Sequence, residues 1–320
     1  MLPLFDELDQ RLIAALQCDG RVTAEHAARV LGVSTRAVQR RWAALFGDGA
    51  VRVVTAPPLP SVDAAMLLDI RMLRGRSDAV AAALAARADI PLIDVSAGGD
   101  RLNAVLLADS AEKNRLVFRQ LPTTSAVTDI DAQSVLHVFA YASQWRLDVL
   151  TEHERVALGA VSADGAPPFS AALEDPLDRD LAAALAEDAR QPAAALARRI
   201  GRPESTVRRR LSALAAHGQL TTEVVVDHRR LGLAVDANLR IRVLPKQLDV
   251  VGRALAAHPA VHGAVATTGA ANLYVAVWLK DLDHLYRFIT RDLADLDVGY
   301  IDTMIVGRNV KRPGRARVDG

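Results

Sequence analysis

The sequence carries one stretch of helix-forming residues twice, and this duplication constrains the fold more than any other feature. Residues 31–45 read LGVSTRAVQRRWAAL, and residues 200–214 read IGRPESTVRRRLSAL. Aligning Leu31 with Ile200 superposes the two stretches without a gap, and this helical register extends upstream, where Leu8-Asp9 meets Leu177-Asp178. A fixed period that spans half a chain indicates an internal duplication, so we expect the two copies to fold alike.

Each copy predicts three helices, of which the last two are arranged as a helix-turn-helix. Thr23 and Ser34 are suited to cap the second and third helices, and Gly32 allows the sharp turn between them. The third helix is the one that such a motif can place in the major groove of DNA. A short β run at Val51–Val54 is expected to form a wing. Three apolar side chains of the third helix should face the core, namely Val38, Trp42 and Leu45.

The exposed polar residues of that third helix are candidate DNA contacts. We expect Thr35, Arg36 and Gln39 to reach base edges, since the N-terminal part of a recognition helix enters the groove most deeply. Arginine suits guanine and glutamine suits adenine. Arg40 and Arg41 are expected to hold phosphates, or one of them pairs with an acid of its own unit. The full set of candidates in the two copies is Ser34, Thr35, Arg36, Gln39, Arg40, Arg41, Glu204, Ser205, Arg208, Arg209 and Arg210.

These basic helix faces also have a plainer explanation. A lone basic face is usually solvated surface, and Glu204 either accepts from cytosine or only favours the start of its helix. Two such faces at matched positions, each following a turn glycine and nearly free of acids, favour DNA contact instead. Because the two helices differ in sequence, we expect an imperfectly palindromic site whose half-sites lie about 34 Å apart or a multiple of that.

After each helical unit the period of the apolar pattern changes to that of a sheet. Residues 64–138 predict the order β-α-β-β-α-β, and the second half repeats it in a sheet register that aligns Leu68 with Leu239. This order is typical of a ferredoxin-like unit, in which helices cover one face of an antiparallel sheet. The open face needs cover, which usually comes from a second such sheet. Strands are expected at 65–73, 90–95, 102–107 and 127–138, with helices at 78–88 and 111–120.

The predicted fold class is therefore α+β, with two winged helix-turn-helix units and two ferredoxin-like βαββαβ units in one chain. The net charge is only +1, but basic residues gather in the helical repeats and at the C-terminal end, where a nucleic-acid partner would need them. The expected boundaries are 1–55 and 175–230 for the DNA-binding domains, 61–140 and 236–310 for the ferredoxin-like ligand or oligomerisation domains, 141–174 for an acidic connector, and 311–320 for a basic, disordered tail.

The sequence argues against several other classes of protein. One cysteine, Cys18, permits neither an internal disulfide nor an all-cysteine metal site. The sequence holds no secretory leader and no apolar run long enough to span a membrane, so we expect a cytoplasmic protein without a membrane partner. Pro259 keeps His258 and His262 off one helical face, so no metal is expected. No nucleotide-binding or hydrolase motif occurs, and we expect neither a cofactor nor catalytic residues.

In the order of its units and in its motifs the sequence resembles the Lrp/AsnC family (leucine-responsive regulatory protein/asparagine regulator). It looks like a dimer of such proteins fused into one chain, and the resemblance covers nearly all of it. The resemblance implies binding of double-stranded DNA, and sensing of a small effector, often an amino acid, by the RAM/ACT-like sheet units. The residues that carry it are Leu177-Asp178, Leu181, Leu185, Ile200-Gly201, Val207–Leu211, Leu214, Gly218, His258–Val261 and Thr268-Gly269.

The resemblance also points to a turn between the second and third strands, which in the family usually reads Gly-x-x-Asp. It reads GGDR at 98–101 and GAAN at 269–272, so neither copy keeps the final acid that would hold an ammonium group. The effector candidates are Gly98, Asp100, Thr268, Gly269 and Asn272, with the second copy favoured because Arg101 reverses the charge in the first. An effector is expected to change how sheet units associate, and so the spacing of the DNA-binding units. An intrachain pseudo-dimer is expected, with further oligomers left open.

Two other functions remain as alternatives. Some decarboxylases of sirohaem-type tetrapyrroles resemble this family, fused two-copy forms included, and rely on histidines and arginines of the sheet units. In this sequence the sheets hold few histidines, and the recognition helices keep their basic residues, so a regulator without enzymatic activity is the main expectation. The other alternative is a ligand-independent protein that compacts or bridges DNA.

Overall fold

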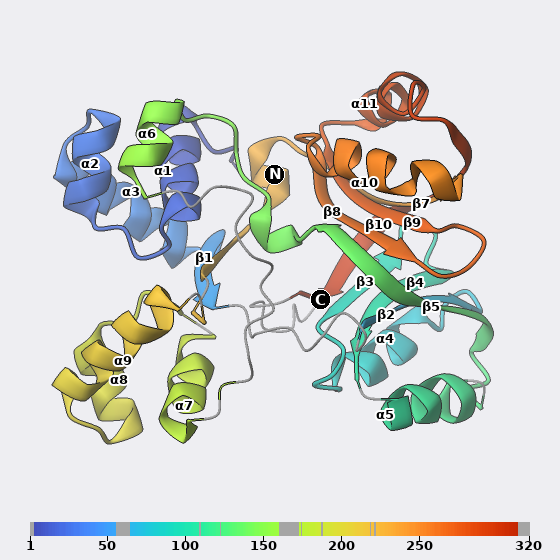
Figure 1. Cartoon of the computed structure of the whole chain (residues 1–320), viewed down its shortest axis with the longest axis horizontal. Coiled ribbons are helices and arrows are strands. Elements are labelled where there is room, and N and C mark those ends of the chain that lie inside the picture. Colours follow the sequence, from blue (N-terminus) through green and yellow to red (C-terminus); the bar gives the residue numbers. More distant parts are fainter. Residues whose placement is uncertain are drawn as a thin grey trace. The chain divides into compact units, whose positions relative to one another are not determined.

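The computed structural model describes residues 3–55, 65–108, 110–121, 123–159, 173, 175–186, 188–217, 219–220 and 222–312. Gly218, the linker at 56–60, residues 160–172 of the connector and the tail beyond Arg312 lie outside the described residues. The chain divides into two compact units, Met1–Leu59 with Arg146–Gly232 and Pro60–Trp145 with Leu233–Gly320 (Figure 1). The first unit, called the helical unit below, holds both helical repeats, and the second, the sheet unit, holds both sheets.

The helical unit contains the predicted three helices in each copy. Thr23 and Ser34 cap α2 and α3 through their hydroxyls, as predicted, and Gly32 ends α2 with a φ of 70°. Pro192 and Pro203 take the capping places in the second copy, and Gly201 repeats the turn with the same φ. The helices are α1 (Glu7–Cys18), α2 (Ala24–Leu31), α3 (Thr35–Gly47), α7 (Pro176–Leu185), α8 (Ala193–Ile200) and α9 (Glu204–Ala216). Val38, Trp42 and Leu45 are buried, as expected.

The strand expected at Val51–Val54 is present, but it does not form a separate wing on the first copy. Strand β1 (Val51–Thr55) pairs antiparallel with β6 (Thr222–Val226), its counterpart from the other copy, from Val51 opposite Val226 to Thr55 opposite Thr222. Two short strands with one apolar face gain backbone hydrogen bonds and buried area by pairing with each other. The result is one ribbon made by both copies, in place of a wing on each.

Part of the predicted connector folds onto the first helical repeat. Helix α6 (Glu152–Ala157) places the Glu154 carboxylate 2.5 Å from the Arg11 guanidinium. The ring of His26 in α2 lies 2.9 Å from the Ala157 carbonyl oxygen. Leu150 and Leu158 on either side of α6 are buried. Residues 146–159 of the predicted connector therefore belong to the helical unit, whereas residues 141–145 belong to the sheet unit.

The sheet unit has the order β-α-β-β-α-β twice, as predicted. The first copy comprises β2 (Ala65–Met72), α4 (Ser77–Ala85), β3 (Leu92–Ser96), β4 (Arg101–Leu107), α5 (Ser110–Arg115) with a π-helical turn at Leu116–Gln120, and β5 (Val127–Ala140). The second comprises β7 (Val235–Val243), α10 (Leu248–Ala256), β8 (Val261–Thr267), β9 (Leu273–Leu279), α11 (Leu282–Arg287) with a π-helical turn at Phe288–Asp292, and β10 (Val298–Lys311). Short 3-10 turns lie at Ala142–Gln144, His228–Leu231 and Pro245–Gln247.

The two sheets join edge to edge into one closed, antiparallel sheet of order β10-β3-β4-β2-β5-β8-β9-β7. The long last strand of each copy makes the junction, since β5 pairs with β2 and then β8, and β10 pairs with β7 and then β3. The joints repeat in the sheet register, with Thr268 N donating to Ser134 O and Ala97 N donating to Ile305 O, both at 2.9 Å. The expectation that a second sheet covers the first is confirmed within the chain.

Apolar and polar residues divide between the two sides of this closed sheet. Leu68 and Ile70 face the helices and join the core that α4 packs against, and the second copy has a matching core. Asp69 between them faces the interior, which follows from the alternation of side chains along a strand. The buried polar residues of the unit are Asp69, Asp94, Asn103, Gln133, Asp236, Asn238, His262 and Thr267. The interior is thus polar, and it brings strands of both copies together.

Candidate nucleic-acid interface

Most of the candidate DNA contacts lie on the outer faces of α3 and α9. Arg36, Gln39 and Arg40 are exposed on α3. At the matched positions of α9, Ser205, Arg208 and Arg209 are exposed as well. No acid among the described residues pairs with Arg36, Arg40 or Arg209, so their guanidinium groups are available to phosphates or bases. Thr35 and Glu204 open the two helices and are half-buried.

Arg41 instead holds its own repeat together. Its guanidinium lies 2.6 Å from Asp6 and 3.2 Å from Asp9, at the start of α1. Hydrogen bonding to Asp6 raises the pKa of Arg41, and the backbone N–H of Asp9, followed by Arg41, lowers the pKa of Asp6. The sequence left open whether Arg40 or Arg41 would pair inside its unit, and the structure assigns this role to Arg41.

Arg210 repeats the same contact in the second copy. Its Nε donates to Asp178 at 2.8 Å, and its guanidinium lies 3.0 Å from Asp175. Asp175 and Asp178 match Asp6 and Asp9 in the helical register. Hydrogen bonding to Asp178 raises the pKa of Arg210. The last arginine of each basic run therefore ties the recognition helix to the first helix of its repeat, in both copies.

Two other candidates are engaged inside the helical unit. The Ser34 hydroxyl accepts from the backbone of Ala37 and serves as the cap of α3. Glu204 accepts from Arg208, one turn along the exposed face of α9. Such a pair on a helix surface contributes little to stability and opens readily. Glu204 therefore sets the resting position of Arg208 rather than removing it from the surface.

Sequence reasoning missed a contact between the two repeats, although a signal for it was present. Arg21 and Arg190 are matched in the helical register, in the loops before α2 and α8. Arg21 donates to the carbonyl oxygens of Ala189 and Gln191, and Arg190 donates to those of Gly20 and Val22. The signal was an arginine at the same position in both copies of a loop in which most other positions differ.

The effector candidates have structural partners in the sheet unit. The Asn272 side chain both donates to Val243 O and accepts from Val243 N, each at 2.9 Å. Thr268 accepts from the backbone of Ser134 at the joint of the two sheets. Asp100 accepts from the Ser96 hydroxyl at 3.2 Å, and Gly98 and Gly269 belong to the same two turns. These residues shape the turns, and a ligand would have to be held beside them or displace these bonds.

Arg101 forms ion pairs with acids of both copies. It donates to Asp69 of its own copy at 2.7 Å and to Asp302 of the other copy at 3.2 Å. Arg240 donates to the same carboxylate oxygen of Asp69 as Arg101 does, and it also pairs with Asp131. Burial lowers the pKa of Arg101, but the hydrogen bonds to Asp69 and Asp302 outweigh it and raise the pKa overall. The interior thus holds a chain of alternating charges, in the order Asp302, Arg101, Asp69, Arg240 and Asp131.

The prediction of a disordered tail is wrong for Arg312, which is held by two acids. Its guanidinium lies 2.9 Å from Asp94 and 3.2 Å from Asp236, two carboxylates that are almost fully buried. Lys311 beside it donates to Ala85 O at 3.0 Å and also to Arg87 O. Burial raises the pKa of Asp94, and Arg312 opposes that rise. Two buried acids require a cation, and Arg312, directly after β10, supplies it.

A small cavity lies in the same polar interior. It is lined by residues of both copies, among them Asp69, Asn103, Gln133, Arg240 and Tyr274. Its volume of about 20 Å³ is enough for roughly one water molecule. The cavity is too small for an amino acid or a larger ligand.

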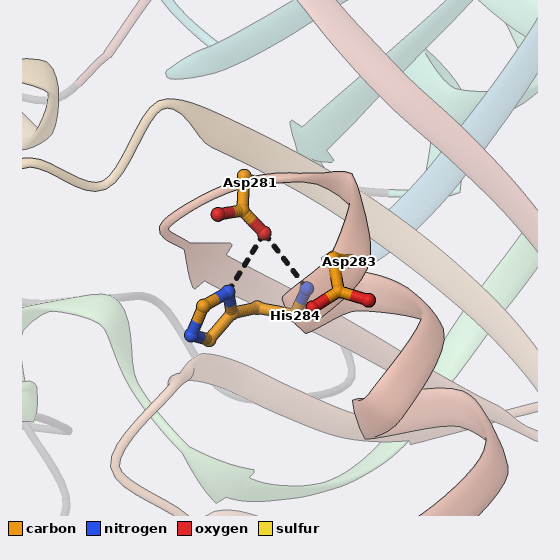
Figure 2. Close-up of side chains that lie close together, drawn as sticks. All are labelled: Asp281, Asp283 and His284. Carbon is orange, nitrogen blue, oxygen red and sulfur yellow. Dashed lines mark hydrogen bonds and ion pairs between the residues drawn. The ribbon is translucent and has the colours of Figure 1, made fainter.

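Asp281, Asp283 and His284 form a cluster of possible metal ligands, with their ligand atoms within 4.8 Å of one another (Figure 2). Asp281 accepts from the backbone N of His284 at 2.9 Å and lies 2.7 Å from its ring Nδ1. Hydrogen bonds to His284 lower the pKa of Asp281. Because Asp281 is the N-cap of α11, helix capping accounts for the cluster.

Among the described residues, no helix is both long and apolar enough to cross a membrane.

Comparison with known proteins identifies the family. The model of the AsnC-type helix-turn-helix domain matches residues 5–45 and 175–215, and that of the Lrp/AsnC ligand binding domain matches residues 236–316. A helix-turn-helix-type transcriptional regulator of Pyrococcus horikoshii is 33% identical over 154 residues, which are 47% of this chain and 97% of the relative. The chain belongs to the Lrp/AsnC family. A second regulator, from Pyrococcus abyssi, is 33% identical over 45% of the chain and 92% of its own length.

Each of these two regulators corresponds over nearly its whole length to about half of this chain. The siroheme decarboxylase NirDL, solved with an iron-uroporphyrin III analogue, matches 96% of this chain and 93% of its own, with a TM-score of 0.57 and 18% identity. At that identity the likeness extends to the fold, in which two copies follow one another in one chain. Membership of the Lrp/AsnC family makes the protein a helix-turn-helix transcriptional regulator that binds DNA.

Proposed function

We propose that this Lrp/AsnC regulator binds one asymmetric DNA site with both recognition helices of the same chain. The observation that carries the proposal is the division of labour within each basic run. Arg41 and Arg210 turn inward to acids of their own repeats, while Arg36, Arg40, Arg208 and Arg209 stay on the surface. Exposed arginines at matched positions on both recognition helices are the arrangement that contact with DNA phosphates and bases requires.

The two helices would read different half-sites. Arg36 and Gln39 offer bidentate contacts to guanine and adenine on one half, whereas Ser205 and Arg208 stand at the corresponding places on the other. Arg40 and Arg209 would hold phosphates on both halves. The preferred site is therefore an imperfect palindrome, and affinity should fall steeply with salt because several phosphates are neutralised.

The sheet unit would carry the response to a small effector, as the ligand binding domain of the family suggests. The internal cavity is too small for such a molecule, so we place its contacts near the turns at Gly98 to Asp100 and Thr268 to Asn272. We propose no enzymatic activity. The fold shared with NirDL motivates one alternative outcome, tetrapyrrole decarboxylation, which the test below includes.

The deciding experiment measures binding to DNA selected from a random pool, and to the DNA upstream of the gene, at two salt concentrations. The variant is Arg36→Ala/Arg208→Ala, and the control is Arg115→Ala/Arg253→Ala, which removes the same charge from surface pairs of the sheet unit. Selective, salt-sensitive binding that only the first variant loses supports the proposal. Absence of binding at low salt overturns it, and a preparation coloured by bound tetrapyrrole would favour the alternative.

A further inference from the structure

In each of the loops before α2 and α8, one arginine donates hydrogen bonds to backbone carbonyl groups of the other loop. Arg190 Nη1 lies 2.6 Å from Gly20 O, and its Nη2 lies 3.0 Å from Val22 O. Arg21 Nη2 lies 3.1 Å from Gln191 O, while its Nη1 donates to Ala189 O. The donors and the acceptors are all related by the helical register. Each planar fork bridges two carbonyl groups of the other repeat, which a lysine cannot do in the same geometry.

Arg190 also reaches the recognition helix of the other copy. Its guanidinium carbon lies 4.8 Å from the ring centroid of Trp42 and 5.7 Å from that of Phe46, both on α3. Burial lowers the pKa of Arg190, as expected for a cation withdrawn from solvent. A cation stacked on an aromatic ring is attracted to the face of the ring. The second repeat therefore holds α3 directly.

The β1–β6 ribbon contacts both of these loops. Ala189 N donates to Val53 O at 2.7 Å, which links the loop before α8 to the ribbon. A methyl group at Gly20 would lie 2.6 Å from Thr222 Cβ and 2.7 Å from Val53 Cγ1, so the loop and both strands are in close contact. Arg230 of the second repeat adds a pair with Asp48, just after α3, at 2.5 Å.

We propose that Arg21 and Arg190, acting with this ribbon, fix the distance and orientation of α3 relative to α9, so that the chain accepts its two half-sites at one spacing only. The inference rests on the proposed DNA-binding function and deepens it. Arg21 and Arg190 are positioning residues, because their guanidinium groups donate to backbone carbonyl groups of the other repeat. An effector bound in the sheet unit would leave the spacing unchanged unless it broke this junction, contrary to the expectation from sequence.

The test uses the full chain and a series of DNA duplexes derived from its selected site. Inserts of about 5 and about 10 base pairs between the half-sites correspond to half a helical turn and one full turn. A rigid pair of helices loses one half-site with either insert, and we expect affinity to fall on the order of 100-fold in both cases. Tethered repeats that move independently would lose affinity with the half-turn insert and recover it with the full turn.

The role of the two arginines is tested with Arg21→Lys/Arg190→Lys, which keeps the charge and removes the forked donation. In this variant we expect the full-turn insert to reduce the affinity by a smaller factor than in the wild type. The affinity for the parent site should change less than this factor does. The matched control is Arg29→Lys/Arg198→Lys, at surface positions of α2 and α8. If the double variant unfolds, as judged by circular dichroism, Arg190→Lys alone is used in the same series.

The outcomes separate this inference from the function on which it rests. If no duplex is selected at all, the DNA-binding function fails. If the wild type binds selectively and tolerates the full-turn insert, the fixed spacing is wrong. If the wild type rejects both inserts and the lysine variant rejects them equally, the two arginines are not the positioning residues.

Discussion

Arg240 on β7 donates to Asp69 on β2, and these two residues occupy the same place in the two copies of the sheet. Two identical copies could not form this pair, because they would place arginine against arginine or aspartate against aspartate. Like charges held together in a low-dielectric interior are costly. The divergence of this one position therefore makes the first sheet specific for the second and disfavours pairing of either sheet with a copy of itself.

Removal of the central acid from this chain of charges should be strongly destabilising. Asp69→Asn leaves Arg101 and Arg240 buried without their shared carboxylate, and we expect the free energy of unfolding to fall by about 3 kcal/mol. Asp69→Leu/Arg101→Met/Arg240→Met should cost less than the single substitution, because the two acids left, Asp131 and Asp302, are partly exposed to solvent. Urea denaturation measures both. A triple variant less stable than Asp69→Asn would contradict the account.

Arg312→Ala should destabilise the protein more at neutral pH than in acid. Burial raises the pKa of Asp94 above its ordinary 3.8, Arg312 opposes the rise, and Asp236 adds to it. A carboxyl with a raised pKa stabilises the folded state fully below 3.8, and this contribution is lost as the pH rises through the folded-state value. Without Arg312 the folded-state pKa climbs further, so the loss is larger and extends to higher pH.

The measurement is urea denaturation of the Arg312→Ala variant over a series of pH values. We expect a difference from wild type of about 3 kcal/mol at neutral pH that shrinks toward pH 4. Arg308→Ala is the control, because Arg308 pairs with the exposed Asp78 on the surface and should cost less than about 1 kcal/mol. An equal loss of stability at every pH would sink this explanation.

Gly252→Ala should destabilise the protein, although alanine normally favours a helix over glycine by about 1 kcal/mol. Gly252 lies inside α10, and a methyl group there would clash with the Phe139 ring of β5. We expect a loss of about 1–3 kcal/mol from overpacking. Gly252→Ala/Phe139→Val should recover part of it, because Ala81 and Val310 stand at the matched positions of the other joint. Thermal unfolding of the single and double variants checks this, and a stabilised single variant would refute it.

Arg40 and Arg41 should separate DNA binding from stability. Arg40 is exposed and is the phosphate contact proposed above, so for Arg40→Ala we expect weaker binding with a salt slope reduced by about 1. Arg41→Ala breaks the pairs with Asp6 and Asp9, and should lower the free energy of unfolding by at most about 1 kcal/mol while leaving the salt slope unchanged. A salt titration of affinity and a urea titration of each variant decide between them. Equal salt slopes for the two variants would mean that Arg41 opens onto DNA.

The sequence alone predicted the duplication, the helix starts and the order of the elements, all of which depend on residues close together in the chain. The register of the duplication predicted two equivalent halves, Thr23 and Ser34 predicted their helix starts, and Gly32 predicted the turn. The period of the apolar residues predicted the order of strands and helices in both sheets. These features follow from local backbone preferences and from which face of an element is apolar, and both are readable over short windows.

Only the tertiary structure decided what the charged and short segments do. Arg312 reads as part of a basic tail because its neighbours are basic, yet two buried acids from distant strands hold it. The sequence around Val51 predicts a wing, because nothing near it in the chain shows that its partner strand lies in the other repeat. Arg40 and Arg41 are adjacent and chemically identical, but only Arg41 meets Asp6 across the repeat. An ionic or backbone contact is set by distance in space, and residues far apart in sequence leave no local pattern that specifies it.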